Sequence, residues 1–200
     1  MKKTALLVID FINDIVHLEG KFRDTATFVY QHQVMERANR VIAFARKNQI
    51  RPIFTKVGFS PGYLECPEHS PLFGNAKKYQ ALQLGTWGTE FHRNIDIQAH
   101  DLVITKHRVS AFYATALEAF LRAHQITHLL ITGVSTDLAV QTTAREAHDR
   151  DYQVTLISDA CGAGSLESHQ FTLKELGSIA QAIDSQFLLH QTHGDLPTSS

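Results

Sequence analysis

Short, unbroken runs of apolar residues recur along this chain and alternate with stretches of helical periodicity. The runs lie at residues 4–9, 52–57, 101–105, 128–132 and 153–157. A run that is apolar throughout predicts a strand buried on both faces of a sheet. Alternation of such strands with helices predicts parallel βαβ units with right-handed crossovers. The expected fold is therefore an α/β three-layer sandwich around a doubly wound, mostly parallel sheet.

Helical patterns fill the intervals between these runs. In the first interval, the apolar positions follow the spacing of one buried helix face; they are Val34, Ala38, Val41, Ile42 and Ala45. Residues 117–121 mark a second helix, and residues 138–148 a third. Residues 58–100 are longer than a normal connection and rich in proline, glycine and aromatic residues. We expect this segment to form a lid over the sheet or a subunit contact.

Composition narrows the class of protein. The chain carries 19 Lys plus Arg against 20 Asp plus Glu, a formal net charge of −1, which argues against a nucleic-acid partner. No apolar run approaches the ~20 residues needed to cross a bilayer, so no membrane partner is expected. The first run ends at Asp10, too early for a secretory signal, and predicts a strand. Only two cysteines occur, Cys66 and Cys161, which favours a reducing, cytoplasmic location.

The length favours one domain, which we place at residues 1–193, with a loose tail at residues 194–200. Within an open parallel sheet, ligands bind beyond the carboxyl ends of the strands. Polar residues follow several of the predicted strands at that edge, namely Asp10, Lys106, residues 135–137 and Asp159. An acid, a base and the start of a helix thus converge from separate strands. The sequence predicts a reaction site there.

The residues at these strand ends resemble those of the isochorismatase-like hydrolases, which include nicotinamidases and carbamoyl-amide hydrolases. The resemblance covers nearly the whole chain and rests on several short motifs in a fixed order. They are residues 6–11 with Asn13 and Asp14, residues 85–88, residues 106–112, residues 133–136, residues 143–147 and residues 159–160. Each motif is weak alone, but their order and their placement at strand ends make the set specific.

The resemblance implies a role for each of these strand ends. Asp10 would transfer protons, with Lys106 beside it to stabilise its charged form. The loop after the fourth strand would aim the backbone N–H groups of Leu138 and Ala139 at a developing oxyanion. Family members also often hold a non-proline cis peptide in this loop, which here would join Val134 to Ser135.

Ala139 departs from the family pattern, because most members carry a nucleophilic cysteine at this position. A methyl group cannot attack a carbonyl, so catalysis by the usual thiol is excluded. Three explanations stay open. The chain is a natural hydrolase without the cysteine, as are the isochorismatases proper, or it is a cysteine amidohydrolase in which the nucleophilic cysteine was replaced by alanine through engineering. The third is a non-catalytic protein that binds a ligand. We favour the first. Cys161 and Cys66 are expected to be buried structural thiols.

We expect the substrate pocket to accept a small anion or a planar molecule. Further candidates for its lining are Phe11, Tyr63, Trp87, His107, Arg108 and Phe112. We expect no metal, because the Asp-x-His stretch of the nicotinamidases is replaced by residues 56–58, and no other cofactor. The expected partners are a small-molecule substrate and, from the resemblance, further copies of the chain in a homodimer or larger homo-oligomer. The particular substrate is left open.

Overall fold

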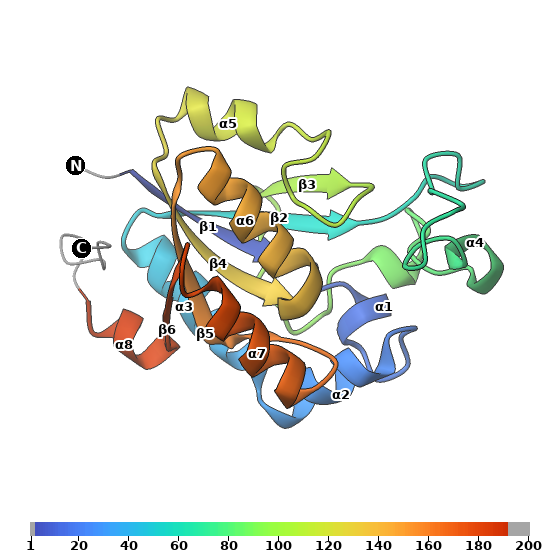
Figure 1. The fold of residues 1–200 in the computed structure, drawn as a ribbon, viewed down its shortest axis with the longest axis horizontal. Coiled ribbons are helices and arrows are strands. Elements are labelled where there is room, and N and C mark those ends of the chain that lie inside the picture. Colours follow the sequence, from blue (N-terminus) through green and yellow to red (C-terminus); the bar gives the residue numbers. More distant parts are fainter. Residues whose placement is uncertain (1–2, 192–200) are drawn as a thin grey trace.

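The computed structural model describes residues 3–191, which build a doubly wound α/β sandwich around one six-stranded sheet (Figure 1). Its strands are β1 (Thr4–Ile9), β2 (Arg51–Val57), β3 (Leu102–Lys106), β4 (His128–Val134), β5 (Gln153–Gly162) and β6 (Gln181–Ile183). They lie in the order β3-β2-β1-β4-β5-β6, and every adjacent pair is parallel. The chain order therefore reverses between β1 and β4, which is where ligands bind in such sheets.

Helices cover both faces of the sheet. One face packs against α2 (Arg23–Gln31), α3 (Val34–Lys47) and α8 (Ser185–Leu189), and the other against α5 (Leu117–Ala123), α6 (Gln141–Asp149) and α7 (Leu166–Leu176). Strand β1 contributes Leu6 and Val8 to the first core, and Ala5, Leu7 and Ile9 to the second. This alternation follows from the two-residue period of a strand, and it explains why the whole run is apolar.

The five predicted strands and three predicted helices are confirmed, but several short elements were not predicted. They are β6, α2, α8 and the single-turn helices α1 (Asn13–Val16) and α4 (Ala76–Tyr79). The three-residue strand and the single-turn helices are too short to show periodicity, whereas α2, with nine residues, is longer than the predicted α5. The third predicted helix begins as a π-helical turn, η2 (Thr136–Val140), before it continues as α6. The predicted tail at residues 194–200 lies outside the described residues.

The long segment at residues 58–100 packs around a small core of its own beyond the carboxyl ends of the strands (Figure 1). Phe59, Tyr63, Phe73 and Leu82 are buried in this core, and the Tyr63 hydroxyl donates to Ala81 O at 2.9 Å. The segment contains α4 and the 3₁₀ turn η1 (Trp87–Thr89). It therefore forms an ordered cover over one edge of the sheet.

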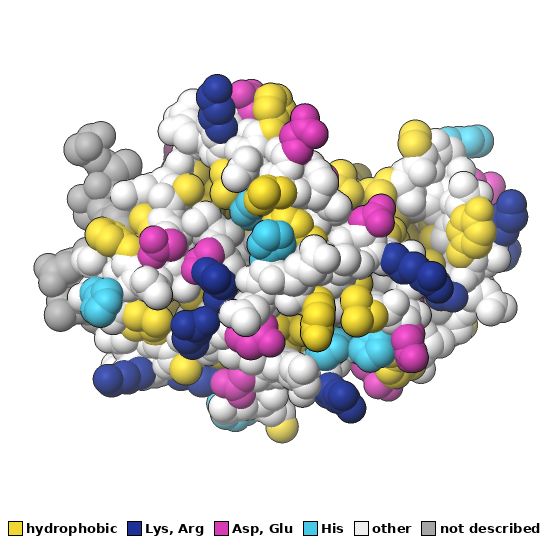
Figure 2. Space-filling view, turned by 90° about the horizontal axis from the view of Figure 1, so that it is seen from below, with side chains coloured by type: hydrophobic (Ala, Val, Ile, Leu, Met, Phe, Trp, Pro, Cys, Tyr) yellow, Lys and Arg dark blue, Asp and Glu magenta, His cyan; other side chains and the backbone are white. Residues whose placement is uncertain are grey.

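Charges of both signs are mixed on the face that Figure 2 draws, where basic, acidic and hydrophobic side chains alternate over short distances. This pattern agrees with the formal net charge of −1. Within residues 3–191, no helix is long and apolar enough to span a membrane.

Candidate active site

Asp10 lies immediately after β1, at the reversal point of the sheet. Its φ of 57° turns the chain out of the strand, a conformation that Asp tolerates better than most residues. The Asp10 N–H donates to Thr55 O of β2 at 3.0 Å, and Thr55 Oγ1 donates to Asp10 Oδ1 at 3.2 Å. The side chain is only 2% exposed. The neighbouring strand thus holds the carboxyl group in place inside the protein.

Lys106, the last residue of β3, brings a buried ammonium to this carboxyl group. Its Nζ lies 2.6 Å from Asp10 Oδ2 and also donates to the backbone oxygens of Val109 at 3.0 Å and Arg108 at 3.3 Å. An ammonium has three protons, and these three acceptors use all of them. Lys106 is therefore a buried cation with its hydrogen bonds satisfied, as such a group requires.

Burial and the ion pair shift the pKa of the Asp10 carboxyl in opposite directions. Removal from water raises the pKa of the Asp10 carboxyl above its ordinary value of 3.8, and this is the larger effect. The Lys106 ammonium and the Thr55 hydroxyl lower that pKa and so limit the rise. A carboxyl group with a raised pKa and a fixed cation beside it is suited both to deliver a proton and to take it back.

The loop after β4 completes the site. Gly133 has a φ of +144°, and a Cβ there would meet Ile9 O at 2.4 Å, so only glycine lets the loop lie against the end of β1. The peptide bond between Val134 and Ser135, in the same loop, is cis, the geometry that the resemblance implied. The Leu138 N–H donates to Ser135 O at 3.1 Å within the π turn, so it is not free for an oxyanion. An oxyanion role for the Leu138 N–H would require this bond to break, and it stays a prediction.

These elements line one small cavity of about 100 Å³. Its polar side chains are Asp10, Lys106, Ser135 and Thr25. The rest of the lining is apolar. The strand ends, the loop after β3 and the start of η2 contribute Val57, Val134, Val109, Leu138 and Ala139, and the N-terminal helical region and the 58–100 cover contribute Ile15, Phe22, Leu72, Phe73 and Leu82. The structure thus brings Asp10, Lys106 and Ala139 together, as the strand ends predict.

Neither cysteine belongs to this lining. Cys161 is buried in the core between the sheet and its helices, and burial raises the pKa of its thiol to about 12. Cys66 lies in the core of the 58–100 cover, where its thiol donates to Phe73 O and burial raises its pKa. Both thiols are buried outside the cavity lining, as expected of structural cysteines. The site that the structure describes is free of sulfur.

The pocket residues suggested by the sequence do not line this cavity. Phe11 is fully buried in one core of the sheet, and Phe112 is buried in the other. Trp87 is 45% exposed and packs edge-on against His17. Tyr63 is buried in the core of the 58–100 cover. None of these four side chains is therefore part of the cavity lining.

His107 and Arg108 are also directed away from the cavity. The Nδ1 atom of His107 lies 2.6 Å from Gly58 O, and its ring stacks on Phe59. The Arg108 guanidinium donates to Glu65 O at 2.9 Å and to His107 O at 2.6 Å. These contacts attach the 58–100 cover to the loop after β3, and neither residue lines the cavity, so their role in anion binding stays a prediction.

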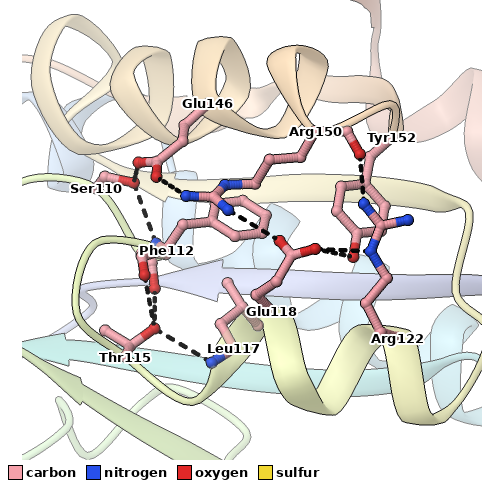
Figure 3. Close-up of polar contacts among 10 residues, drawn as sticks. Ser110, Phe112, Thr115, Leu117, Glu118, Arg122, Glu146, Arg150 and Tyr152 are labelled. Carbon is pink, nitrogen blue, oxygen red and sulfur yellow. Dashed lines mark hydrogen bonds and ion pairs between the residues drawn. The ribbon is translucent and has the colours of Figure 1, made fainter.

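An ion-pair network holds the loop that follows Lys106 (Figure 3). The Ser110 hydroxyl donates to Glu146 of α6 and accepts from the Phe112 N–H at 3.1 Å. Glu146 is in turn paired with Arg150, whose guanidinium lies 3.5 Å from Glu118 of α5. The network thus connects α5 and α6 to Ser110. The preceding residue, Val109, accepts a hydrogen bond from Lys106 Nζ through its carbonyl oxygen. The network therefore supports the position of the buried ammonium from outside the cavity.

We expect Glu146→Ala to lower the free energy of unfolding by about 1–3 kcal/mol, because Ser110 and Arg150 both lose a partner. Urea unfolding followed by circular dichroism measures this change. Glu175→Ala, which removes an exposed carboxylate from α7, is the matched control and is expected to stay within about 0.5 kcal/mol. Equal effects of the two substitutions would contradict a supporting role for the network.

Other motif residues brace the cover rather than enter the cavity. The Asn13 side chain donates to Trp87 O at 2.9 Å, and Asp14 Oδ2 accepts from the Leu82 N–H at 2.7 Å. A Cβ on Gly88 would meet Asp14 Oδ2 at 2.4 Å, which explains the glycine. Sequence reasoning missed Thr55, which lies inside an apolar run and carries no signal of its contact with Asp10. No group of three potential metal ligands is present among residues 3–191.

A buried acid–base pair in a cavity at the reversal point of a doubly wound sheet defines an α/β enzyme site. The isochorismatase domain model matches residues 4–187. The chain is 30% identical over 187 residues to the ureidoacrylate amidohydrolase RutB of Acinetobacter baylyi, covering 86% of this chain and 76% of that protein. This chain therefore belongs to the isochorismatase family of hydrolases.

Two further comparisons agree with this assignment. The chain is 31% identical over 175 residues to the uncharacterized isochorismatase family protein YwoC of Bacillus subtilis, covering 86% of this chain and 85% of that protein. The structure of a cysteine hydrolase from Pseudomonas syringae pv. phaseolicola matches with a TM-score of 0.84 at 19% identity, over 94% of this chain and 91% of that one. The latter supports the fold alone.

Proposed function

We propose that this chain is a hydrolase that works without a thiol, with Asp10 as the acid–base residue and Lys106 as its fixed counter-ion. The observation that carries the proposal is the cavity itself, in which Asp10 and Lys106 share the lining with Ala139 and with no sulfur atom. A thiol-free site needs a substrate that becomes reactive on protonation. An enol ether is such a substrate, because protonation of its vinyl carbon creates an oxocarbenium centre.

The proton steps follow from the pair. Asp10, protonated, delivers its proton to the vinyl carbon, and the carboxylate left behind is stabilised by the Lys106 ammonium 2.6 Å away. Water then adds to the oxocarbenium carbon and returns a proton to Asp10. The resulting hemiketal breaks down to a carbonyl compound and an alcohol. We place the Ala139 N–H, at the start of the helix after β4, towards the oxygen that gains negative charge in that breakdown.

A second candidate is a cysteine amidohydrolase in which alanine replaces the nucleophile. It is supported by the relative named ureidoacrylate amidohydrolase and by the position of Ala139 in the cavity lining. A third, a ligand-binding protein without activity, has no chemical need for a buried Asp10–Lys106 pair. We further propose a small-molecule substrate, a homodimer or larger homo-oligomer, and a cytoplasmic location, the last supported by two buried free cysteines.

The test compares the protein with Ala139→Cys on a panel of small amides, ureides and enol ethers. We expect the unaltered protein to hydrolyse an enol ether, because the thiol-free route needs only Asp10 and water. Amide hydrolysis that appears only with the new cysteine would instead favour the second candidate. Ala139→Ser is the matched control, because it adds a side-chain heteroatom of lower nucleophilicity. No turnover by any of the three forms would favour the ligand-binding protein. Product release is measured by chromatography.

A further inference from the structure

The charges around the cavity restrict what can bind there. Asp10 and Lys106 form the only acid and the only base among the described lining residues, and each neutralises the other. All three protons of Lys106 already have acceptors, namely Asp10 and the carbonyls of Arg108 and Val109. A carboxylate that entered this cavity would therefore meet the Asp10 carboxyl and find no free cation. Burial of an unpaired anion is strongly unfavourable.

No other cation lines the cavity among the described residues. Arg108 lies outside the lining, and its Nη1 donates to Glu65 O and His107 O of the cover and the loop after β3. Lys21 lines a second, outer depression of about 450 Å³ that shares Phe22, Leu72 and Leu82 with the inner cavity. Lys21 lines only the outer depression, and Asp10 lines only the inner cavity. The side chains that line both spaces are therefore apolar.

Size restricts the reacting group as well. A dry cavity of about 150 Å³ accepts one benzene molecule, so the inner cavity of about 100 Å³ accepts only a smaller group, such as an enol ether or an amide. A larger substituent can extend along Phe22, Leu72 and Leu82, which line both spaces, into the outer depression. Apolar contacts along that path favour a hydrocarbon substituent over a charged one.

We propose that this enzyme acts on uncharged molecules that carry a small polar reacting group on an apolar substituent, and that it discriminates against carboxylates. The inference rests on the proposed function, because it assigns the substrate class of the same site. It separates this chain from a relative such as ureidoacrylate amidohydrolase, whose substrate, by its name, contains a carboxylate.

Binding of two matched ligands tests the inference without requiring turnover. The ligands are 4-methylpentanamide and succinamate, which share an amide and a chain of the same length but end in an isopropyl group and a carboxylate, respectively. We expect the uncharged amide to bind about tenfold or more tightly, because the carboxylate has no partner in the site. Titration monitored by NMR gives both dissociation constants. Equal or tighter binding of succinamate, or no saturable binding of 4-methylpentanamide, would overturn the inference.

A pair of variants tests whether charge is the cause. Leu138 lines the cavity and is 42% exposed, so its side chain can change without loss of the core. We expect Leu138→Arg to tighten succinamate binding about tenfold, whereas Leu138→Gln, its uncharged control, leaves the preference unchanged. No gain with Leu138→Arg would overturn the assignment of the preference to charge. Circular dichroism and thermal unfolding verify that both variants are folded.

The variant Lys21→Gln tests whether the cation of the outer depression binds a substrate carboxylate. If Lys21 anchors a substrate carboxylate, succinamate will bind well to the unaltered protein and lose that affinity in Lys21→Gln, which overturns the inference. We expect Lys21→Gln to leave both dissociation constants unchanged. The binding results are independent of the proposed function: a preference for the uncharged amide without hydrolysis of any enol ether would contradict the thiol-free mechanism alone. Hydrolysis together with tight succinamate binding would contradict the substrate class alone.

Discussion

Asp10→Asn is expected to lower turnover of a hydrolysed substrate by about 10²–10⁴-fold, the usual contribution of a positioned acid–base group. Asparagine has nearly the shape of aspartate. Its carbonyl oxygen can still accept from Lys106, while its amide group donates to the Thr55 hydroxyl, which turns to accept, so the fold is expected to persist. It cannot deliver a proton, however. The effect should therefore appear in turnover and leave the circular dichroism spectrum unchanged.

The pH profile gives this prediction a second readout. Asp10 must be protonated to begin the reaction, and burial raises its pKa above 3.8. The kcat/KM of the unaltered protein should therefore fall as the pH rises through this raised pKa, and the falling limb should vanish in Asp10→Asn. Asp24→Asn, at an exposed carboxylate of α2, is the matched control and should retain the limb. Intact turnover by Asp10→Asn would remove Asp10 from the mechanism.

Lys106→Met is expected to lower the free energy of unfolding by about 3–5 kcal/mol, the cost of leaving one member of a buried ion pair alone. Methionine keeps much of the length of lysine, so the loss falls on Asp10 and on the carbonyls of Arg108 and Val109. The double variant Asp10→Asn/Lys106→Met should lose less than the sum of the two single variants. Denaturant unfolding of all four proteins measures this coupling, and strictly additive losses would contradict it.

The loss in Lys106→Met should also depend on pH. Without the ammonium, only burial and the Thr55 hydroxyl act on Asp10, so its pKa in the folded protein rises further. A group whose folded pKa is raised contributes stability below its unfolded pKa and loses it as the pH rises through the folded pKa. The variant should accordingly be least stable at neutral to alkaline pH and recover part of its stability in acid.

The central fold could be predicted because each buried strand is apolar on both faces and each long helix repeats its apolar positions. The same reasoning could not predict β6, which has three residues, or α1 and α4, which are single turns. Residues 58–100 were identified as an unusual connection that covers the sheet. Their internal packing, with Phe59 and Tyr63 in a separate core, depends on contacts with no periodic signal.

Asp10 and Lys106 could be placed at one site from the sequence because a parallel sheet sends the ends of all its strands to one edge. Ala139 was singled out by the resemblance to the family, whose members mostly carry a cysteine there. The rule for parallel sheets determines where a residue lies along the sheet, but not where its side chain points. His107 and Arg108 follow Lys106 directly, yet both are directed into the 58–100 cover. Only the folded chain, in which the Lys106 protons are consumed by Asp10 and two backbone carbonyls, decides that the cavity has no free cation. Sequence order thus determined which residues meet at one edge of the sheet, Asp10 and Lys106 among them, whereas tertiary packing decided the charge and size of the space around them, because the directions of side chains depend on contacts that the order of strands does not specify.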